Sequence, residues 1–364
     1  MCKDLNMQRS IQEIGSEFWI EYEPERLLKK REGVYAISGR TAIDLILQVL
    51  IKKRPVRSVY MPAWCCDSML APFLAHEIDV KIYDVSLEAR MTTNDHELSI
   101  NYSLPNTDET DSTDILYVTN YFGYENTLSI EMVKRFKEKG AFILYDRTHS
   151  FLMEDQEYQE LADYHFASIR KWMGVVGGSV VNGLTKKPTL KECPYASIKE
   201  KAMKDKWCYL QGDTSIVKDK FLKAFGEFGH HLAEDYQNYE MDTLSYAIYR
   251  QEDLKLMAKR RRENAAYLHD NLKGVKFIGR FTDKAVPLFV PVFFENKEKR
   301  DAVRKALVEN QIYCPVHWPK PQQIPADFTV NQIVDTELSV ICDQRYGLTD
   351  MERIVAQISQ ITQK

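Results

Sequence analysis

The stretch "DYHFASIRKWMGVVGGSVVNG" (163–183) decides the fold, because it encloses a single lysine, Lys171, between two apolar runs. Residues 164–169 have the pattern of a strand, and a Gly-Gly pair opens a second apolar run at 178–182. Lysine has a long stem with much rotamer freedom and an ammonium group that resists burial. A lysine among tryptophan, valines and glycines therefore either extends to solvent or takes part in chemistry.

The chain around this stretch alternates between β-rich and helical patterns. Between residue 34 and about residue 181, apolar runs of strand length recur, and the segments between them carry apolar residues at helical spacing. The predicted strands are 58–62, 80–85, 114–122, 141–147, 164–169 and 178–182, and the predicted helices are 40–53 and 129–140. This alternation is typical of an α/β domain with a mostly parallel sheet flanked by helices.

The sequence predicts three divisions of the chain. Residues 1–33 form an N-terminal arm, and residues 34–243 form the large α/β domain, whose part after about residue 185 lacks a clean period and predicts irregular connecting helices. Residues 244–364 predict a small C-terminal α+β domain that begins with one long helix to about residue 273. Its later elements are predicted at 275–279, 286–294, 296–311, 312–316, 338–346 and 349–360.

Composition and charge disfavour several classes of function. The 364 residues are 44% hydrophobic and 28% charged, which is an ordinary globular composition. The formal net charge of −4 disfavours nucleic acid or an anionic membrane as a partner, and the basic run at 259–262 predicts a solvated helix face. No apolar run reaches the ~20 residues that span a bilayer. The seven cysteines form no C-x-x-C pair, so we expect reduced thiols, no metal site and a cytoplasmic location.

In open parallel sheets, ligands bind at the carboxyl ends of the strands, and four segments near such positions carry candidate residues. The first segment, "SGRT" (38–41), precedes a predicted amphipathic helix. A glycine permits close approach of the backbone, a helix start offers free N–H groups, and an arginine adds a charged donor for a phosphate. The candidate phosphate ligands are Ser38, Gly39, Arg40 and Thr41. The alternative is a plain serine N-cap with the arginine in solvent.

The second and third segments follow two later strands. Asp146 ends an apolar strand, with His149 three residues later, and a buried carboxylate there is costly unless it meets a cation. The alternative is an acid that caps the next helix. Ser168 and Lys171 are also three residues apart, so that a hydroxyl can bind an anion while a partly desolvated amine attacks a carbonyl group. The S-x-x-K spacing alone is a weak signal.

The fourth segment is "PAWCCDSM" (62–69), which follows the first predicted strand. Trp64 can stack on a planar ring, and the alternative is a tryptophan that packs against the next helix. For Cys65 and Cys66 a structural role is favoured over a catalytic thiol, because buried structural cysteine is common.

Together these segments match the needs of one cofactor. A phosphate site, a ring-sized aromatic residue, an acid at a strand end, and a serine with a lysine occur in that order along a parallel sheet. Pyridoxal 5'-phosphate requires a helix start for its phosphate, a carboxylate for its pyridinium nitrogen and a lysine for its aldehyde. The sequence therefore predicts a protein that binds this cofactor.

The chain resembles the fold type I pyridoxal-phosphate enzymes, and among them it is similar to the DegT-like sugar aminotransferases. The resemblance extends from about residue 34 to the end. It rests on "ISGRTAI" (37–43), "VYMPAWCCDSMLAPF" (59–73), "FILYDRTHSF" (142–151), "MAKRRRENAAYL" (257–268) and "LSVICDQRYGLTDMERI" (338–354). It implies the fold type I architecture, with a large mostly parallel α/β domain and a small α+β domain, and a homodimer.

The resemblance also implies roles for the candidate residues. Lys171 would hold the cofactor aldehyde as a Schiff base and move the Cα proton as a general base. Asp146 would pair with the pyridinium nitrogen, and His149 would bond the ring hydroxyl. The phosphate would be held by Ser168, Gly39 and Arg40.

Four features depart from the family pattern or leave a role open. Asn120 falls where the fold often places a polar residue beside the ring, and Cys66 falls where an aromatic residue usually stacks on it, two residues after Trp64. The family has a longer gap between the phosphate-binding serine and the lysine. The partner-subunit N-Y-R segment has no clear match, because "SYAIYRQEDL" (245–254) lacks its asparagine.

The favoured function is an aminotransferase that moves an amino group from an amino-acid donor to a keto or aldehyde acceptor, with a nucleotide-linked sugar among the candidates. A lysine stands where related dehydratases carry histidine, which disfavours that branch. The alternatives are a lyase, decarboxylase or acyl-transferring enzyme on the same fold, and an inactive binding or regulatory protein. Arg345 is a candidate for binding the substrate carboxylate, against the alternative of a surface salt bridge with Asp343 or Asp350.

Overall fold

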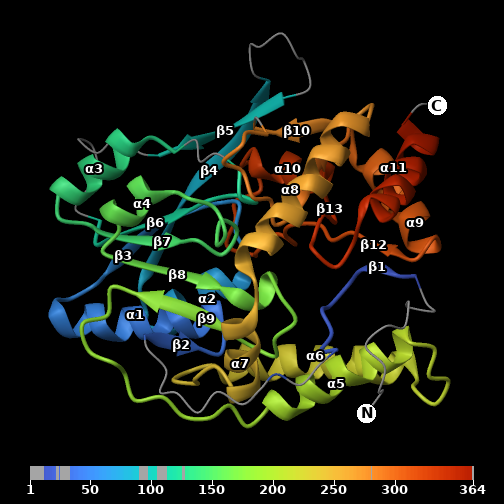
Figure 1. Ribbon diagram of the computed structural model, residues 1–364. Helices are drawn as coiled ribbons and strands as arrows, with labels where there is room; N and C mark the ends of the chain where they lie inside the picture. The colour runs from blue at the N-terminus through green and yellow to red at the C-terminus, as the bar shows by residue number, and fades with distance from the viewer. Residues whose placement is uncertain are drawn as a thin grey trace.

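A computed structural model of the chain describes residues 12–21, 24, 33–89, 97–104, 113–124, 128–279 and 281–362. Within these residues, one 11-stranded sheet runs through the molecule in the order β13-β11-β10-β5-β4-β3-β6-β7-β8-β9-β2 (Figure 1). Most of the predicted N-terminal arm lies outside the described residues.

The centre of the sheet is the parallel part that the sequence predicts. Its parallel strands are β4 (Asp79–Ala89), β3 (Ser58–Pro62), β6 (Ile115–Thr119), β7 (Phe142–Asp146) and β8 (Tyr164–Ser168). The edge is completed by β9 (Ser179–Asn182), which is antiparallel to both of its neighbours, and β2 (Val34–Ala36). The predicted α/β fold class is confirmed. Strand β6 ends earlier than predicted, because Phe122 and Gly123 have φ angles of +61° and +78° and turn the chain.

Helices cover both faces of this part of the sheet (Figure 1). One face carries α1 (Gly39–Lys53) and α2 (Asp67–Ala75), and the other carries α3 (Ile130–Glu138) and α4 (Gln156–Leu161). The first and third of these helices begin at serine caps, Ser38 and Ser129, whose hydroxyls accept N–H groups of the first turn.

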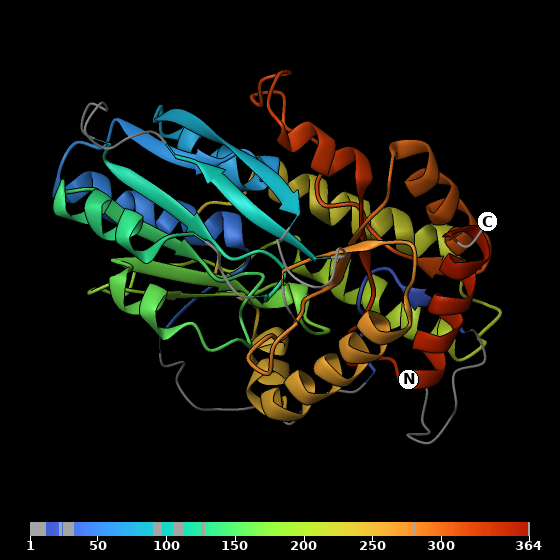
Figure 2. The ribbon, with the colours of Figure 1, turned by 90° about the horizontal axis from the view of Figure 1, so that it is seen from above.

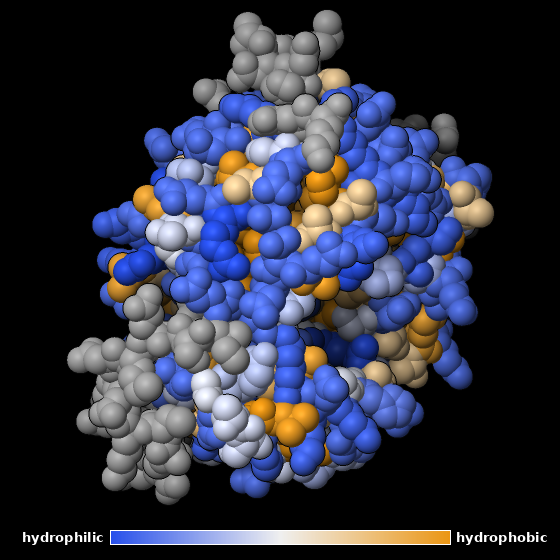
Figure 3. All heavy atoms as spheres, turned by 90° about the vertical axis from the view of Figure 1, so that its right-hand side faces the viewer, coloured by the Kyte–Doolittle hydropathy of each residue, from blue (hydrophilic) through white to orange (hydrophobic). Residues whose placement is uncertain are grey.

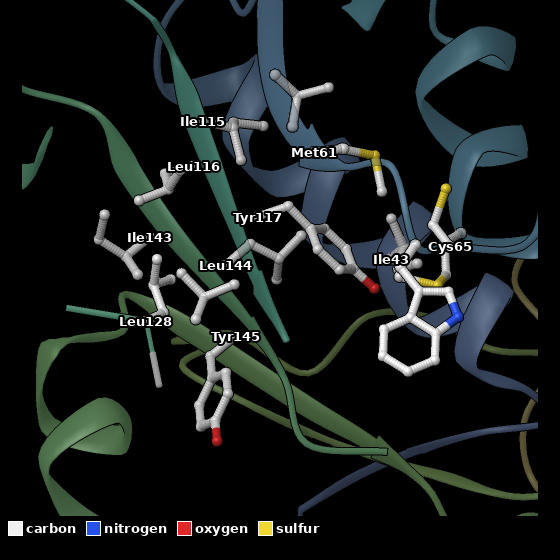
Figure 4. Close-up of a cluster of buried hydrophobic side chains, with 14 of the residues drawn as sticks. Ile43, Met61, Cys65, Ile115, Leu116, Tyr117, Leu128, Ile143, Leu144 and Tyr145 are labelled. Atoms are coloured by element: carbon white, nitrogen blue, oxygen red, sulfur yellow. The ribbon is translucent and has the colours of Figure 1, made fainter. Parts of the chain in front are cut away.

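The core lies between the sheet and these helices. In Figure 4, Tyr117 of β6 points toward Ile43 and Cys65, whereas Tyr145 of β7 points away from them. The ring of Tyr145 lies 5.6 Å from that of Tyr158 in α4, so that neighbouring strands supply both faces of the sheet with buried side chains.

The sheet continues beyond β4 through strands that the alternating pattern does not include. They are β5 (Glu97–Ser103), which is antiparallel to β4, and then β10 (Lys276–Ile278), β11 (Val290–Phe293) and β13 (Glu337–Val340). Around the last strands lie α9 (Lys297–Glu309), α10 (Val330–Thr336) and α11 (Leu348–Thr362) (Figure 2). A two-stranded sheet pairs β1 (Ile14–Gly15) with β12 (Ile312–Tyr313). Because one sheet runs through both parts, the domain boundary near residue 243 stays a prediction.

Two regions differ from the predicted helices. The connector after residue 185 contains two regular helices, α5 (Ala196–Leu210) and α6 (Lys218–Glu234), which pack against each other. Buried Lys199 and Lys206 interrupt the apolar period of α5. The long helix predicted from residue 244 is two helices, α7 (Thr243–Gln251) and α8 (Leu254–Asn271), because the Asp253 carboxylate caps the start of the second one.

None of the described helices is long and apolar enough to cross a membrane. Figure 3 shows that hydrophilic residues cover most of the face seen there, with apolar residues in small separate patches. Apolar side chains instead gather inside the molecule, around the central sheet, around the C-terminal strands and around the segment that follows β8.

Candidate active site

The carboxyl ends of the parallel strands β3, β6, β7 and β8 meet around one cavity, which we call the strand-end cavity. Helix α1 begins beside it. The predicted residues that line it are Gly39, Cys66, Asp146, His149, Ser168 and Lys171. The topology thus brings together residues from separate strand ends, as the rule for open parallel sheets leads one to expect.

Asp146 is held at the end of β7 by two hydrogen bonds. Tyr117 donates its hydroxyl to Oδ2 at 2.7 Å, and the main-chain N–H of Thr148 donates to Oδ1 at 2.8 Å. Burial raises the pKa of the carboxyl above its ordinary value, although these donors and Lys171 act in the opposite direction. The carboxyl is therefore fixed at the cavity wall, where a cationic partner would favour its ionised form.

His149 lines the same cavity as a neutral imidazole. The Phe122 N–H donates to its Nδ1 at 3.2 Å, and burial together with the charge of Lys171 lowers its pKa to about 3. The ring proton is therefore on Nε2, which can donate to an acceptor in the cavity.

Asn120 does not lie beside the cavity, so this prediction was wrong. It is fully buried in the turn after β6, where its amide donates to the Tyr124 carbonyl at 2.8 Å and accepts the Gly123 N–H at 3.1 Å. Its neighbour Thr119 lines the cavity instead. Asn120 follows the end of β6 at Thr119, and its two hydrogen bonds hold its side chain inside the turn.

Lys171 lies between the strand-end cavity and a second cavity of about 320 Å³ on the side of the C-terminal strands. We call the second one the C-terminal cavity. Burial, followed by the charge of Arg170, lowers the pKa of Lys171 below its ordinary value. Gly177 allows the lysine loop to close on the strand before α1, because a Cβ there would lie 2.6 Å from the Ile37 carbonyl oxygen. Lys171, with its lowered pKa, thus lies where the two cavities meet.

A third cavity, of about 140 Å³, adjoins the start of α1, and we call it the cationic cavity. Its polar lining is Glu17, Ser38, Arg40, Ser68, Arg170 and Lys199. The Nε atoms of Arg40 and Arg170 are buried with no hydrogen-bond partner among the described residues. Lys199 is 4% exposed, its Nζ lies 3.8 Å from a carboxylate oxygen of Glu17, and burial lowers its pKa to about 8. Three cations at a helix start, two of them with an unsatisfied donor, favour an anion.

Ser38 and Thr41 use their hydroxyls inside the protein. Ser38 Oγ accepts the Thr41 N–H at 3.1 Å, and Thr41 Oγ1 donates to the Tyr236 carbonyl at 2.8 Å. Thr41 is fully buried and lines neither of the two cavities beside α1, so its predicted phosphate contact was wrong. The alternative prediction placed Arg40 in solvent. Its guanidinium instead donates to the Leu232 carbonyl and lines the cationic cavity.

The ring-stacking candidates separate in the structure. Trp64 lies in the core with 1% of its surface exposed, because its Nε1 donates to the His317 carbonyl at 2.8 Å and its ring stacks on Tyr121 at 4.5 Å. It does not line the strand-end cavity, so the prediction that it stacks on a ring there was wrong. Cys66 does line that cavity, and so does Trp318 from the segment before β13. The indole of the site thus comes from the C-terminal part.

Arg345 lines the C-terminal cavity but is already engaged in an ion pair. Its Nε and Nη2 each lie 2.8 Å from a different carboxylate oxygen of Asp343. Burial alone would raise the pKa of Asp343, but Arg345 and Arg261 hold it below its ordinary value. The salt bridge with Asp343, which the sequence offered as the alternative, is therefore present, but it is buried and does not lie at the surface. Carboxylate binding by Arg345 stays a prediction.

The basic run on α8 is not entirely the solvated face that the sequence predicts. Arg261 is fully buried, because it lies on the inner side of the helix. It donates from Nη2 to the Trp172 carbonyl at 3.2 Å and from Nη1 to the Leu288 carbonyl at 2.9 Å. This arginine therefore ties the lysine loop to the C-terminal strands.

Several residues of the three cavities were not predicted. They are Ser68, Thr119, Lys199, His317 and Trp318. Thr119 could have been found from its place at a strand end. Lys199 has the pattern of a surface charge on a helix, and the other members lie in loops or at a helix start with no periodic signal.

The sequence model of the DegT/DnrJ/EryC1/StrS aminotransferase family matches residues 218–339. A search of curated proteins finds no match.

Solved structures share the fold over most of the chain. The aminotransferase TlmJ from Streptoalloteichus hindustanus is 13% identical, with a TM-score of 0.61 over 90% of this chain and 84% of that one. NtdA from Bacillus subtilis, solved with bound cofactor PMP, is 14% identical, with a TM-score of 0.61 over 92% of this chain and 74% of that one. PseC from Helicobacter pylori is 13% identical, with a TM-score of 0.61 over 92% and 87%.

The solved structures show that the chain has the fold of these aminotransferases. Its segment from α6 to β13 resembles the DegT/DnrJ/EryC1/StrS aminotransferase family. The resemblance that the sequence predicts is thereby confirmed.

Proposed function

We propose that the protein is a pyridoxal-phosphate-dependent aminotransferase that moves an amino group from an amino-acid donor to a carbonyl acceptor. The observation that carries this proposal is the position of Lys171 between two cavities, one lined by Asp146 and His149 and the other by arginines. The first suits a planar ring with a protonated nitrogen and a phenolic oxygen, and the second suits an anionic substrate. The family match supports transamination over the lyase, decarboxylase, acyl-transfer and inactive alternatives.

The residues around the strand-end and cationic cavities fit this cofactor. Asp146 would accept the pyridinium N–H, and His149 would donate from Nε2 to the oxygen on the ring. The unsatisfied donors of Arg40 and Arg170, with the ammonium of Lys199, would hold the phosphate at the start of α1. When bound, the cofactor supplies an electron sink for the Cα carbanion of the substrate.

Lys171 would serve this chemistry twice. Its Nζ would hold the cofactor through the aldehyde group, and the Lys171 amine, when free, would move the proton at Cα of the donor. Because its pKa is lowered, first by burial, a larger share of the amine is neutral than on a surface lysine. Trp318 would cover the ring from the C-terminal side and exclude water from it.

A sugar is the acceptor that we propose, with a nucleotide-linked one as the leading candidate. Similar solved structures include DesI in the presence of its TDP-sugar product, and PseC, an aminotransferase involved in the biosynthesis of pseudoaminic acid. The lining of the C-terminal cavity has more cations than carboxylates, which suits a ligand with anionic groups: Arg170, Lys171, Arg261 and Arg345 stand against Glu17 and Asp343. A homodimer and a cytoplasmic location belong to this proposal, which the family resemblance and the free thiols of the described cysteines support.

Borohydride reduction of the cofactor-loaded protein, followed by peptide mapping, tests the proposal. The label should fall on Lys171, and a label on another lysine would refute it. Lys206→Gln is the matched control, because Lys206 is also buried, with a pKa lowered to about 7 by burial, but lines none of the three cavities. This variant should be labelled like the wild type. Adding amino acids one at a time should then discharge the cofactor absorbance with the true donor, whereas carbon dioxide release would favour a decarboxylase.

A further inference from the structure

The C-terminal cavity contains a buried chain of polar groups that the proposed cofactor site does not use. His317 lines this cavity together with Lys171 and is 6% exposed. Its Nδ1 lies 2.8 Å from Ser339 Oγ, and Ser339 Oγ lies 2.5 Å from Glu337 Oε1. The main-chain N–H of His317 donates to Glu337 Oε2 at 2.7 Å. The three residues thus form a closed hydrogen-bonded unit.

Strand β13 holds this unit in place. Alternate residues of a strand project to the same face, so Glu337 and Ser339 both project toward the segment that carries His317. Both are fully buried. The nearby cation, Arg300 of α9, donates from Nη1 to the main-chain oxygen of Glu337. Because Nδ1 and the main-chain N–H of His317 are engaged inside the unit, Nε2 is the polar atom through which the imidazole can meet a ligand in the cavity.

The surroundings keep the imidazole neutral while the carboxyl can change its protonation. The titratable groups that face the two ends of the unit are Arg300, Cys314, His149 and Lys171. Burial raises the pKa of Glu337 to about 8, against the opposing effects of Ser339, the His317 N–H and the arginine. Burial also lowers the pKa of His317 well below its ordinary value, and the two facing groups near the imidazole add to this.

The chain of hydrogen bonds permits two arrangements. With Glu337 ionised, Ser339 donates to the carboxylate, His317 donates from Nδ1 to Ser339, and Nε2 is an acceptor. With Glu337 protonated, the carboxyl donates to Ser339, Ser339 donates to Nδ1, and the imidazole proton is on Nε2, which is then a donor. The second arrangement contains one more proton than the first, and this proton comes from solvent. Donor and acceptor are also exchanged in both side-chain hydrogen bonds.

We propose that Glu337 and Ser339 are positioning residues that set the tautomer of His317, and that His317 Nε2 contacts an oxygen of the acceptor substrate and contributes to specificity. The substrate contact rests on the proposed function. The coupling of the His317 tautomer to the protonation of Glu337 through Ser339, which we call the tautomer relay, does not. The relay makes the cavity wall a hydrogen-bond donor or an acceptor according to the protonation of a carboxyl that lies outside the cavity.

Nitrogen NMR of the full chain with labelled histidine, recorded from about pH 6 to about pH 10, tests the relay. We expect His317 to pass from the Nε2–H to the Nδ1–H tautomer as the pH rises. His149 should keep the Nε2–H tautomer throughout, because its Nδ1 accepts the Phe122 N–H, and it serves as an internal reference. Glu337→Gln should hold His317 in the Nε2–H form at every pH, since an amide can donate to Ser339.

Variants of the serine complete the test. Ser339→Ala should remove the pH dependence of the tautomer, and Ser339→Thr, which keeps the hydroxyl, should retain it. A tautomer that stays constant in the wild type, or that changes in the same way in Ser339→Ala, overturns the relay.

A second experiment tests the substrate contact. The acceptor KM should change with pH over the range of the tautomer change and should lose that dependence in Glu337→Gln. An identical dependence in both proteins overturns the contact. A protein that shows the tautomer change but transaminates no donor refutes the proposed function and leaves the relay standing.

Discussion

The strand-end cavity and the cationic cavity share Ser68 and Arg170 in their linings but are built in opposite ways. In the strand-end cavity, Asp146 receives two hydrogen bonds and His149 receives one, all from within the protein. In the cationic cavity, two guanidinium Nε atoms are buried with no partner among the described residues. A buried unsatisfied donor costs about 1–3 kcal/mol, which a bound anion would recover. One cavity is therefore organised before any ligand binds, and the other gains its missing contacts from a ligand.

Because of this difference, we expect variants in the two cavities to change different quantities, the reaction rate in one case and the anion affinity in the other. Variants in the strand-end cavity should change the rate of the reaction and leave anion binding nearly as it is, because the groups there are fixed by the protein itself. Variants in the cationic cavity should change anion affinity. Inorganic sulfate measures that affinity without the rest of the cofactor, and its charge is constant over the pH range of interest.

Lys171→Ala should have the largest effect. Removing the amine that binds the aldehyde and moves the proton should lower turnover by about 10⁴–10⁶-fold, the scale for loss of a catalytic nucleophile. Initial rates with a saturating donor measure this loss, and calorimetry with sulfate should show nearly unchanged binding. Turnover within about tenfold of the wild type would assign the lysine to structure.

Asp146→Asn should come next. The amide fits the same place but cannot favour a protonated ring nitrogen, so kcat should fall on the order of 10²–10³-fold while the cofactor stays bound. Tyr117→Phe is the matched control, because it keeps the carboxyl and removes one of its two hydrogen bonds. Its effect on kcat should be much smaller. Wild-type turnover in Asp146→Asn would leave the carboxyl as a helix cap.

These two residues could be predicted from sequence because strand ends in a parallel sheet converge. Each follows a buried apolar run, so the topology fixes its place once the run is recognised. The same rule fails where the end of a strand is misjudged, as for β6, which was predicted to run to residue 122. Strand β6 ends at Thr119, and Asn120 consequently points into the core, while its neighbour lines the cavity.

The residues that sequence did not reveal come from segments without a periodic signal. Lys199 looks like any charged residue of a polar helix, and only the packing of α5 buries it. Trp318 and His317 lie in an irregular segment between β12 and α10, and their place beside the lysine depends on how the C-terminal strands extend the sheet. Trp64 was misassigned because aromatic packing in the core and ring stacking in a site have the same sequence pattern.

Arg345→Leu tests whether the arginine of the C-terminal cavity serves to bind an anion, as proposed for the cationic cavity, or to stabilise the fold. Arg345 is already paired with Asp343, so its loss leaves a buried carboxylate without its main partner, and the free energy of unfolding should fall by about 3 kcal/mol. Urea denaturation measures this change. Sulfate binding should stay nearly unchanged, because this arginine does not line the cationic cavity.

Asp343→Asn distinguishes the ion pair from a carboxylate clamp. If Arg345 binds the donor carboxylate, weakening its pair with Asp343 should lower the donor KM, while Arg345→Leu should raise it. A donor KM that is the same in both variants would confine the arginine to a structural pair. Unchanged stability with a raised KM in Arg345→Leu would instead make it a clamp.

Lys199→Gln should have the smallest effect and the clearest pH signature. Loss of one charged donor should weaken sulfate binding about tenfold, the lower end for a charge-assisted hydrogen bond. Burial lowers the pKa of Lys199 to about 8, so the ammonium is present below that pH and lost above it. Wild-type affinity for sulfate should therefore fall as the pH rises through about 8. The variant should lack this fall in affinity.

The stability of the ligand-free protein should change in the opposite direction. In the unfolded chain the lysine keeps its proton up to about pH 10.4, so between that pH and the folded-state pKa of about 8 the unfolded state binds more protons. The contribution of Lys199 to the free energy of unfolding therefore rises with pH over this interval, while sulfate affinity falls.

Lys206→Gln is the matched control, since burial lowers the pKa of Lys206 to about 7 but its ammonium lies outside the cationic cavity. It should alter the stability profile and leave sulfate affinity unchanged. Sulfate affinities of Lys199→Gln and wild type that coincide at every pH would reduce Lys199 to a partner of Glu17 and leave Arg40 and Arg170 as the anion site.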